Sequence, residues 1–451
     1  MKLENIKRVY LIGIGGIGMS ALARYFKNRG SDVFGYDKTP TALTGVLEEE
    51  GINISFADEL QEIPALFNIP DSNTLIIYTP AIPEDCKILN FFRNASFSLK
   101  KRSEVIGIIS KGMFTIAVAG THGKTTTSSI IAHILKDSGY DCYAFLGGIA
   151  SNYNSNFLVG NNNTLVVEAD EYDRSFLTLH PDISVITSMD ADHLDIYGDQ
   201  NHLTRSFQLF ASQLKKDGTL IRRKGLDLET GLSYAANEDA DVYAFNIRIT
   251  DGNFWFNFKN NSVSIENIQF NLPGLHNIEN CVAAIEVALK LGIFTERIKE
   301  AVGNFKGVKR RFEYVIRNEK HVYIDDYAHH PAELKACILA VKSLYPDKKL
   351  TLIFQPHLFS RTRDFADGFA EALSSIDQLI MLDIYPAREI PIEGVSSKMI
   401  LDKISGGSNK VYGKQETIDL IRFEKPELLV TAGAGDIDML VKPLKNILEN
   451  A

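Results

Sequence analysis

The chain of 451 residues has a formal net charge of −9, and 45% of its residues are hydrophobic while 23% are charged. A single hydrophobic core rarely serves more than about 300 residues, so we expect several domains, and the negative charge argues against a surface for nucleic acid or an anionic membrane. No apolar run approaches the roughly 20 residues of a membrane span, and the polar start of the chain lacks the apolar stretch of a signal peptide. The four cysteines lie far apart in the sequence, which favours buried, reduced thiols in a cytoplasmic protein.

A glycine-rich turn near the start of the chain is the first motif. It follows the apolar run 9–12 in the spacing G-x-G-x-x-G, with Gly13, Gly15 and Gly18. Two further predicted strands end at Asp37 and at Thr79. Strands that alternate with helices predict a parallel α/β sheet, and the turn predicts a diphosphate site. NAD and a UDP-sugar both carry a diphosphate, and a structural βα turn without a ligand is the alternative.

A second glycine-rich turn follows the predicted buried strand 114–119. It reads Gly120-Thr121-His122-Gly123-Lys124-Thr125-Thr126 and leads into a helix. Backbone N–H groups at such a turn bind phosphate. Lys124 adds a positive charge against the outer phosphates, and the Thr125 hydroxyl can reach Mg²⁺. The strict P-loop pattern has a glycine where this chain has Val118. The motif predicts a nucleoside-triphosphate site in an enzyme, against the alternative of an ordinary turn with an exposed lysine.

Two later strands of this segment, predicted at 164–167 and 183–186, end in acidic residues. Glu168 follows the first strand, and His193, flanked by two aspartates, follows the second. Ligands collect at the carboxyl ends of parallel strands, so we expect the glycine turn, Glu168 and His193 to face one site. Carboxylate oxygen suits Mg²⁺, whereas imidazole is an unusual ligand for it, so a metal role and a structural role both stay open for His193. Residues 240–272 alternate apolar and polar and predict an antiparallel β insert or sheet edge.

The last third of the chain predicts another α/β unit with polar residues after its strands. Its strands are predicted at 321–325, 350–354, 378–383 and 428–431. Asp326, Tyr327 and His329 follow the first of these, and Arg361 follows the second. Such groups can bind zinc, hold a ribose or position a substrate, although no common zinc spacing is matched. Arg361 and Arg363 suit phosphate or carboxylate, with surface salt bridges as the alternative, and the basic run 309–311 is equally open to a solvated surface role.

Together these motifs resemble the Mur ligase family. The matching segments cover nearly the whole chain: 13–20, 120–126, 168–171, 192–197, 276–280, 310–312, 326–331, 355–362 and 382–389. The form Gly-Thr-His-Gly-Lys-Thr is typical of these ligases and accounts for Val118. The resemblance implies an α/β protein of three domains: an N-terminal Rossmann-like UDP-binding domain (1–109), a central P-loop ATPase domain (110–307) and a C-terminal Rossmann-like domain (308–451).

The resemblance also implies a reaction with ATP and Mg²⁺. ATP phosphorylates the lactyl carboxylate of UDP-N-acetylmuramic acid, the amine of L-alanine attacks the acyl phosphate, and phosphate leaves; this is the first peptide-stem step of peptidoglycan synthesis. Phosphorylation is chemically reasonable because a carboxylate is a poor electrophile, whereas an acyl phosphate has a good leaving group. The protein's part is then mainly positioning and charge neutralisation. The alternative within the family is attachment of a recycled tripeptide to the same nucleotide sugar, and the form of the first glycine turn favours L-alanine.

Each motif residue receives a role by this resemblance. The residues implied to bind ATP are Gly120, Thr121, His122, Gly123, Lys124, Thr125, Thr126, His276, Asn280, Arg311 and Asp326. Those implied to bind the UDP-sugar are Gly15, Gly16, Gly18, Asp37 and Thr79. The implied metal ligands are Thr125, Glu168 and His193. Tyr327, His329 and Arg361 are implied to handle the amino acid and the reacting end of the sugar nucleotide. The implied catalytic residues are Lys124, His193, His329 and Arg361.

Two features depart from the family pattern, and two unrelated functions compete with it. No lysine occurs between His193 and Lys215, so the lysine carbamate of several related ligases is not predicted. Leu358 stands where the family commonly has an arginine, so one charge contact is missing or is supplied by Arg363. The first glycine turn and Asp37 also suit a nicotinamide-dependent oxidoreductase, which the P-loop argues against. A nucleotide-binding regulator without catalysis is the other alternative. We expect a monomer or homodimer that acts on small molecules and binds neither nucleic acid nor a membrane.

Overall fold

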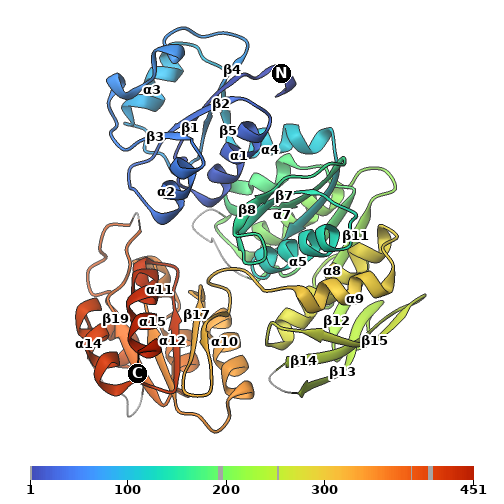
Figure 1. Ribbon diagram of the computed structural model, residues 1–451, viewed down its shortest axis with the longest axis vertical. Helices are drawn as coiled ribbons and strands as arrows, with labels where there is room; N and C mark the ends of the chain where they lie inside the picture. The colour runs from blue at the N-terminus through green and yellow to red at the C-terminus, as the bar shows by residue number, and fades with distance from the viewer. Residues whose placement is uncertain (1–2, 191–196, 251–252, 388, 405–409, 451) are drawn as a thin grey trace. The chain divides into compact units, whose positions relative to one another are not determined.

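The chain folds into three sheets with helices packed against them (Figure 1). The computed structural model describes residues 3–190, 197–250, 253–387, 389–404 and 410–450. Its contacts divide the chain into two compact units. One unit comprises 1–246, 256–268 and 279–306, and the other comprises 247–255, 269–278 and 307–451. None of the helices within the described ranges is both long and apolar enough to cross a membrane.

The first sheet has five parallel strands in the order β3-β2-β1-β4-β5. They are β1 (Arg8–Ile12), β2 (Asp32–Tyr36), β3 (Asn53–Ser55), β4 (Thr74–Tyr78) and β5 (Leu99–Lys101). The helices of this part are α1 (Ile17–Asn28), α2 (Ala42–Glu49), α3 (Lys87–Asn94) and α4 (Arg102–Lys111), with short 3₁₀ turns at Leu3–Asn5, Leu60–Glu62 and Ala65–Phe67. The strand order reverses beside β1, and open sheets bind ligands at such a switch point. The loop after β1 is the predicted glycine turn.

The central strands β1 and β4 of this sheet are buried on both faces, which explains their continuous apolar sequences. Val9 and Leu11 belong to one hydrophobic cluster, while Tyr10, on the opposite face, packs against Phe67 and Phe92. The Tyr10 ring lies 5.3 Å from that of Phe67 and 5.0 Å from that of Phe92. Successive side chains of a strand point to opposite faces, so a strand covered on both sides needs apolar residues at every position.

The second sheet has ten strands in the order β15-β14-β13-β12-β11-β10-β6-β9-β7-β8. They are β6 (Phe114–Ala119), β7 (Tyr143–Ala150), β8 (Ser155–Leu158), β9 (Thr164–Glu168), β10 (Ile183–Ile186), β11 (Thr219–Arg223), β12 (Leu232–Ala236), β13 (Val242–Thr250), β14 (Asn253–Asn260) and β15 (Ser264–Phe270). The helices are α5 (Lys124–Asp137), α7 (Gln200–Ser212), α8 (Leu275–Lys290) and α9 (Thr295–Asn304), with a 3₁₀ segment η4 at Tyr172–Thr178. A short turn closed by Asn260 N–H and Val263 O, 3.0 Å apart, reverses the chain between β14 and β15, as the alternating pattern of 240–272 predicts.

The third sheet has six strands in the order β16-β17-β21-β18-β19-β20, and only β16 pairs antiparallel. They are β16 (Glu313–Arg317), β17 (Val322–Asp326), β18 (Leu350–Phe354), β19 (Gln378–Leu382), β20 (Val411–Tyr412) and β21 (Leu428–Ala432). The helices are α10 (Pro331–Leu344), α11 (Phe359–Asp364), α12 (Ala366–Leu373), α13 (Lys398–Leu401), α14 (Lys414–Glu424) and α15 (Val441–Glu449), with a 3₁₀ turn at Asp436–Leu440. Pro331 begins α10, where its missing N–H costs no hydrogen bond. All four cysteines are buried free thiols, as predicted.

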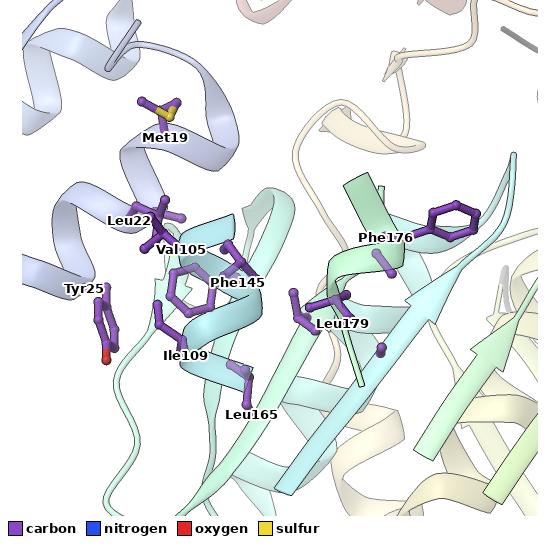
Figure 2. Close-up of a cluster of buried hydrophobic side chains, with 14 of the residues drawn as sticks. Met19, Leu22, Tyr25, Val105, Ile109, Phe145, Leu165, Phe176 and Leu179 are labelled. Carbon is purple, nitrogen blue, oxygen red and sulfur yellow. The ribbon is translucent and has the colours of Figure 1, made fainter. Parts of the chain in front are cut away.

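One hydrophobic cluster joins the helices of the first sheet to the second sheet (Figure 2). The side chains labelled there are Met19, Leu22 and Tyr25 of α1, Val105 and Ile109 of α4, Phe145 of β7, Leu165 of β9, and Phe176 and Leu179 at η4. The rings of Tyr25 and Phe145 are 5.6 Å apart. Beside them the largely buried Arg24 pairs with Glu50 at 2.7 Å and donates to Asn156. The glycine turn after β1 is therefore fixed to the second sheet through α1.

Replacing the central ring of this cluster tests its contribution to stability. Phe145 is 4% exposed, so we expect Phe145→Ala to lower the free energy of unfolding by about 3–5 kcal/mol through lost burial and a residual cavity. Phe423, which is 88% exposed, provides the control, and Phe423→Ala is expected to change stability by less than about 0.5 kcal/mol. Urea unfolding followed by circular dichroism measures both, and equal shifts in the two variants would contradict this account of the interface.

Candidate active site

Strand register brings the polar strand ends of the second sheet to one edge. β6 lies between β9 and β10, with Val118 opposite Glu168 on one side and Ala119 opposite Ile186 on the other. All three strands run parallel, so their carboxyl ends share this edge. The second glycine turn, Glu168 and the first residues after β10 therefore meet at this edge, and the part of the prediction that concerns His193 stays a prediction.

Two glycines give the second turn its shape. Gly120 has φ +140° and Gly123 has φ +83°, conformations that residues with a Cβ rarely adopt. A Cβ on Gly120 would lie 2.1 Å from the Thr187 hydroxyl, and one on Gly123 would lie 2.8 Å from Asn280 Oδ1. Helix α5 begins at Lys124, so its first-turn N–H groups have no acceptor within the helix and point at the turn. This geometry suits a phosphate group.

The residues after β10 hold the turn in place. Ser188 Oγ accepts a hydrogen bond from His122 N–H at 2.7 Å and lies 2.9 Å from Thr121 Oγ1. Thr187 Oγ1 donates to Ala119 O at 3.1 Å. Thr187 and Ser188 were not among the predicted site residues, although their position directly after a buried strand was an available signal.

Lys124 is paired with a buried carboxylate that the sequence analysis did not identify. Its Nζ lies 2.9 Å from Glu171 Oε1 and 2.8 Å from Oε2, and Glu171 is 1% exposed. Burial by itself lowers the pKa of Lys124, but the Glu171, Glu168 and Asp170 carboxylates outweigh it and raise that pKa above its usual value. The ammonium group is therefore charged and held against Glu171.

Glu168 is the described carboxylate best placed to bind a cation beside the second glycine turn. Its Oε2 accepts a hydrogen bond from Gly147 N–H at 3.0 Å, and a Cβ on Gly147 would lie 2.2 Å from the same oxygen. Thr125, the other predicted ligand among the described residues, is buried in the first turn of α5. His193 lies outside the described residues. No group of three or more His, Cys, Asp or Glu side chains suited to a metal occurs within the described ranges. Two oxygen donors nevertheless fit Mg²⁺, which usually keeps waters and phosphate oxygens as its other ligands.

The first glycine turn is surrounded by polar groups from the same part of the chain. Gly15 N–H donates to Asp37 Oδ2 at 2.8 Å, and Gly16 precedes α1 as its N-cap. A Cβ on Gly18 would lie 2.8 Å from Arg102 Nη1. Arg102 also donates to Asp170 at 2.9 Å, so it links this turn to the acidic segment after β9.

Two more of the predicted residues also lie against the glycine turns. Thr79 follows β4, and its Cγ2 would lie 2.8 Å from a Cβ on Gly13. Asn280 is buried on α8 beside Gly123, and His276 lies one helical turn earlier on the same helix, where it is exposed.

In the second unit, two arginines that precede β16 lie beside the ring of Tyr327, which follows β17. The guanidinium groups of Arg310 and Arg311 lie 5.1 and 5.0 Å from the Tyr327 ring centre. Asp326 accepts hydrogen bonds from the N–H groups of Phe312 at 2.7 Å and Ala328 at 2.8 Å. Burial raises the pKa of Asp326 to about 6 against the opposing charge of Arg311.

Asp325, the last residue before the predicted site residue Asp326, holds Arg310 in place. It is 1% exposed, lies 3.3 Å from Arg310 Nε and accepts a hydrogen bond from Thr431 Oγ1 at 2.5 Å. Burial raises the pKa of Asp325 to about 7, although Arg310 favours its ionised form. Arg310 and Phe312 have φ of +61° and +50°, so this turn is strained and depends on its partners.

His329 is held by two acceptors and lies near Arg361. Its Nδ1 is 3.0 Å from Tyr327 O and 3.3 Å from Glu333 Oε2. Burial, with smaller contributions from Arg361 and Arg311, lowers the pKa of His329 to about 4 against the opposing effect of Glu333. The neutral ring then donates through Nδ1 and presents Nε2 as an acceptor. Arg361 is 8% exposed on α11.

Leu358, one departure from the family pattern, adopts an unusual backbone conformation. Its φ is +69°, and it precedes α11 as the N-cap. Arg363, named as a substitute for the missing arginine, is half exposed and pairs with Asp364 at 2.7 Å.

Family models match three successive segments of the chain. They are described as "Mur ligase family, catalytic domain" over residues 8–113, "Mur ligase middle domain" over 118–288 and "Mur ligase, glutamate ligase domain" over 310–435. The prediction of an α/β fold of three domains is thereby confirmed, together with the three sheets.

Individual relatives match over the whole length. A UDP-N-acetylmuramate–L-alanine ligase of Flavobacterium johnsoniae is 51% identical over 448 residues, which is 99% of each chain. The structure of a UDP-N-acetylmuramate-alanine ligase of Thermotoga maritima matches 98% of this chain and 99% of its own with a TM-score of 0.85 and 26% identity. A murein peptide ligase of Psychrobacter arcticus shares the fold, with a TM-score of 0.70 and 21% identity over 99% of both chains. The glycine turns, the lysine at the start of α5 and these matches lead to one conclusion: the chain belongs to the Mur ligase family.

Proposed function

We propose that this chain is the ATP-dependent ligase that joins L-alanine to the lactyl carboxylate of UDP-N-acetylmuramic acid. The observation that carries the proposal is the Lys124 turn at the start of α5, in a chain that matches a relative of that name over 99% of both lengths. The murein peptide ligase is the second candidate, and its 21% identity supports a shared fold alone. An oxidoreductase is disfavoured because it has no use for a triphosphate turn.

The second glycine turn, called the phosphate turn below, is proposed to hold ATP for the first chemical step. A carboxylate oxygen of the sugar nucleotide attacks the γ-phosphorus of ATP, the bond from that phosphorus to the β,γ-bridging oxygen breaks, and ADP leaves. Lys124 and the N–H groups at the start of α5 neutralise charge on the phosphates and hold them in line. Asn280 and His276 on α8 are proposed to contact adenine.

Magnesium is proposed to bind Glu168 and Thr125, with His193 as a further ligand. The oxygen chemistry of Glu168 and Thr125 fits Mg²⁺. When bound, the ion supplies positive charge to the phosphate oxygens. Gly147 orients the Glu168 carboxylate by hydrogen bonding to it.

The second unit is proposed to supply the groups for amide formation. The amine of L-alanine attacks the acyl carbon, the bond from that carbon to the phosphate oxygen breaks, and the nitrogen loses a proton. Tyr327, His329 and Arg361 are assigned to the amino acid and the reacting carboxylate, Arg311 to phosphate and Asp326 to ribose. A pKa of about 4 keeps His329 neutral at neutral pH. The ring can therefore accept a hydrogen bond from the amine, but it is a weak base for removing the proton.

The first glycine turn is proposed to bind the diphosphate of the sugar nucleotide. Gly15, Gly16 and Gly18 lie at the start of α1, and Asp37 and Thr79 border them. The Gly15 N–H is already bound to Asp37. Asp37 therefore shapes the turn in addition to any contact with the uridine end.

Several predictions about the whole chain stay predictions. These are the limits 1–109, 110–307 and 308–451, a monomeric or homodimeric state, a cytoplasmic location, and the absence of nucleic-acid and membrane binding. Helix α4 extends to Lys111, two residues beyond the first limit.

Phosphate release by the purified full-length protein tests the proposed reaction. With Mg-ATP and UDP-N-acetylmuramic acid, we expect release when L-alanine is added and none with the tripeptide. Lys124→Ala removes the phosphate-binding charge and is expected to lower the rate at least about 100-fold. Lys136→Gln, which changes a lysine in the last turn of the same helix paired with Asp141, serves as the control and should retain wild-type activity. Release with the tripeptide alone would assign the protein to recycling instead.

A single added methyl group tests Glu168 as a magnesium ligand. The Cβ of Gly147→Ala would displace the Glu168 carboxylate, so we expect the Mg²⁺ concentration for half-maximal activity to rise about tenfold or more. Gly112→Ala is the matched control, since its nearest neighbour would be Ile109 O at 3.9 Å. An unchanged magnesium titration in a folded Gly147→Ala protein counts against the assignment.

Acid stability tests the buried state of His329. The unfolded chain takes up the proton near pH 6.5 and the folded protein only near pH 4, so the stability from the neutral ring is complete above pH 6.5 and is lost as the pH falls toward 4. We expect the wild type to lose about 1–3 kcal/mol more unfolding free energy than His329→Gln between pH 6.5 and 4. Urea unfolding of both proteins at the two pH values gives the difference. An equal loss of unfolding free energy in the wild type and in His329→Gln would show that the ring is not buried as a neutral group.

A further inference from the structure

The three protons of the Lys124 ammonium group already have acceptors in the described structure. They are the Glu171 carboxylate at 2.8–2.9 Å, Thr121 O at 3.4 Å and Gly120 O. A lysine ammonium group has only these three donors. A phosphate that binds Lys124 must therefore replace at least one of them.

Glu171 is the acceptor that a phosphate replaces most directly. The two carbonyl groups belong to the turn that cradles the phosphate, whereas a carboxylate and a phosphate compete for the same positive charge. The ion pair is well shielded from water, because the side chains of Lys124 and Glu171 are 14% and 1% exposed. Shielding strengthens the attraction between the two charges and makes their separation costly.

The segment around Glu171 is fixed on both sides, so the carboxylate cannot simply follow the lysine. The Tyr197 hydroxyl donates to Glu171 O at 2.6 Å. The preceding residue, Asp170, accepts from Arg102 at 2.9 Å, and two residues later Asp173 lies 3.4 Å from Lys101. Asp173 and Arg174 have φ of +52° and +54°, so the backbone here is bent into a conformation that needs such support.

We propose that Glu171 is a positioning residue that competes with nucleotide phosphates for Lys124 and holds the ammonium group folded back along its turn until nucleotide binds. This inference rests on the proposed function and assigns to the acidic segment a role beyond that of the metal ligand Glu168. Nucleotide binding then includes the opening of the Lys124–Glu171 pair. The measured affinity is reduced because only molecules in which the pair is open can bind nucleotide through Lys124.

The test is the affinity of the full-length protein for ADP, measured by calorimetry without added metal. Glu171→Gln keeps the side-chain size and removes the competing charge, so ADP should bind about tenfold more tightly. If Glu171 were purely structural, its substitution would weaken ADP binding rather than strengthen it. The gain should disappear in a Lys124→Ala background, because it acts through that lysine.

Glu286→Gln is the matched control. Glu286 is another buried glutamate of this unit, 3% exposed, 3.6 Å from Lys290 and bonded to Asn260. Its substitution should leave ADP affinity at the wild-type value. If Glu171→Gln does not fold by circular dichroism, Glu171→Asp withdraws the carboxylate by one methylene and should give a smaller gain of about threefold.

Unchanged or weaker ADP binding in a folded Glu171 variant overturns this inference, as does a gain that persists without Lys124. A wild-type protein that binds neither ADP nor a non-hydrolysable ATP analogue with Mg²⁺ overturns the proposed function itself. The two failures are therefore distinguished in the same titrations.

Discussion

The parallel pairing of β6 with β9 and β10 is the constraint on which the rest of the site depends. It places Val118 opposite Glu168 and Ala119 opposite Ile186. A shift by one residue would turn every side chain of a strand to the other face of the sheet. The phosphate turn, the proposed magnesium ligand and the serine that holds the turn would then no longer meet. The buried apolar strands are thus the reason that polar chemistry converges at their ends.

Charge balance is the second organising feature of this edge. The acidic segment after β9 contributes Glu168, Asp170 and Glu171, while Lys124 and Arg102 provide the cations that pair with it. Each cation also lies beside a glycine turn, since Lys124 begins α5 and Arg102 borders Gly18. The same positive charges that stabilise the acidic segment are therefore the ones placed to meet phosphate. A buried charge requires a partner both with and without bound phosphate.

Local patterns explain why much of the architecture was predictable. Apolar runs marked strands such as β6 and β17 within a residue or two, because both faces of these sheets are covered. Glycine spacing marked both turns, since positive φ and close backbone approach demand glycine there. Glu171 and Arg102 escaped prediction because their roles come from contacts with residues tens of positions away, and a charged residue has no local signature for such a contact. The proposed roles of His193 and of the other site residues stay predictions.

The sequence by itself determined the family, the α/β class and the positions of the glycine turns, because these follow from periodicity, spacing and residue type along the chain. Only the tertiary structure decided which acceptor holds Lys124 and how far burial moves the pKa values of Asp325 and His329. It also decided that Gly147 must lack a side chain so that the carboxylate of Glu168 has room. Ion pairing and desolvation depend on distance and on exclusion of water. Both are properties of the packed chain, and the order of residues alone does not specify them.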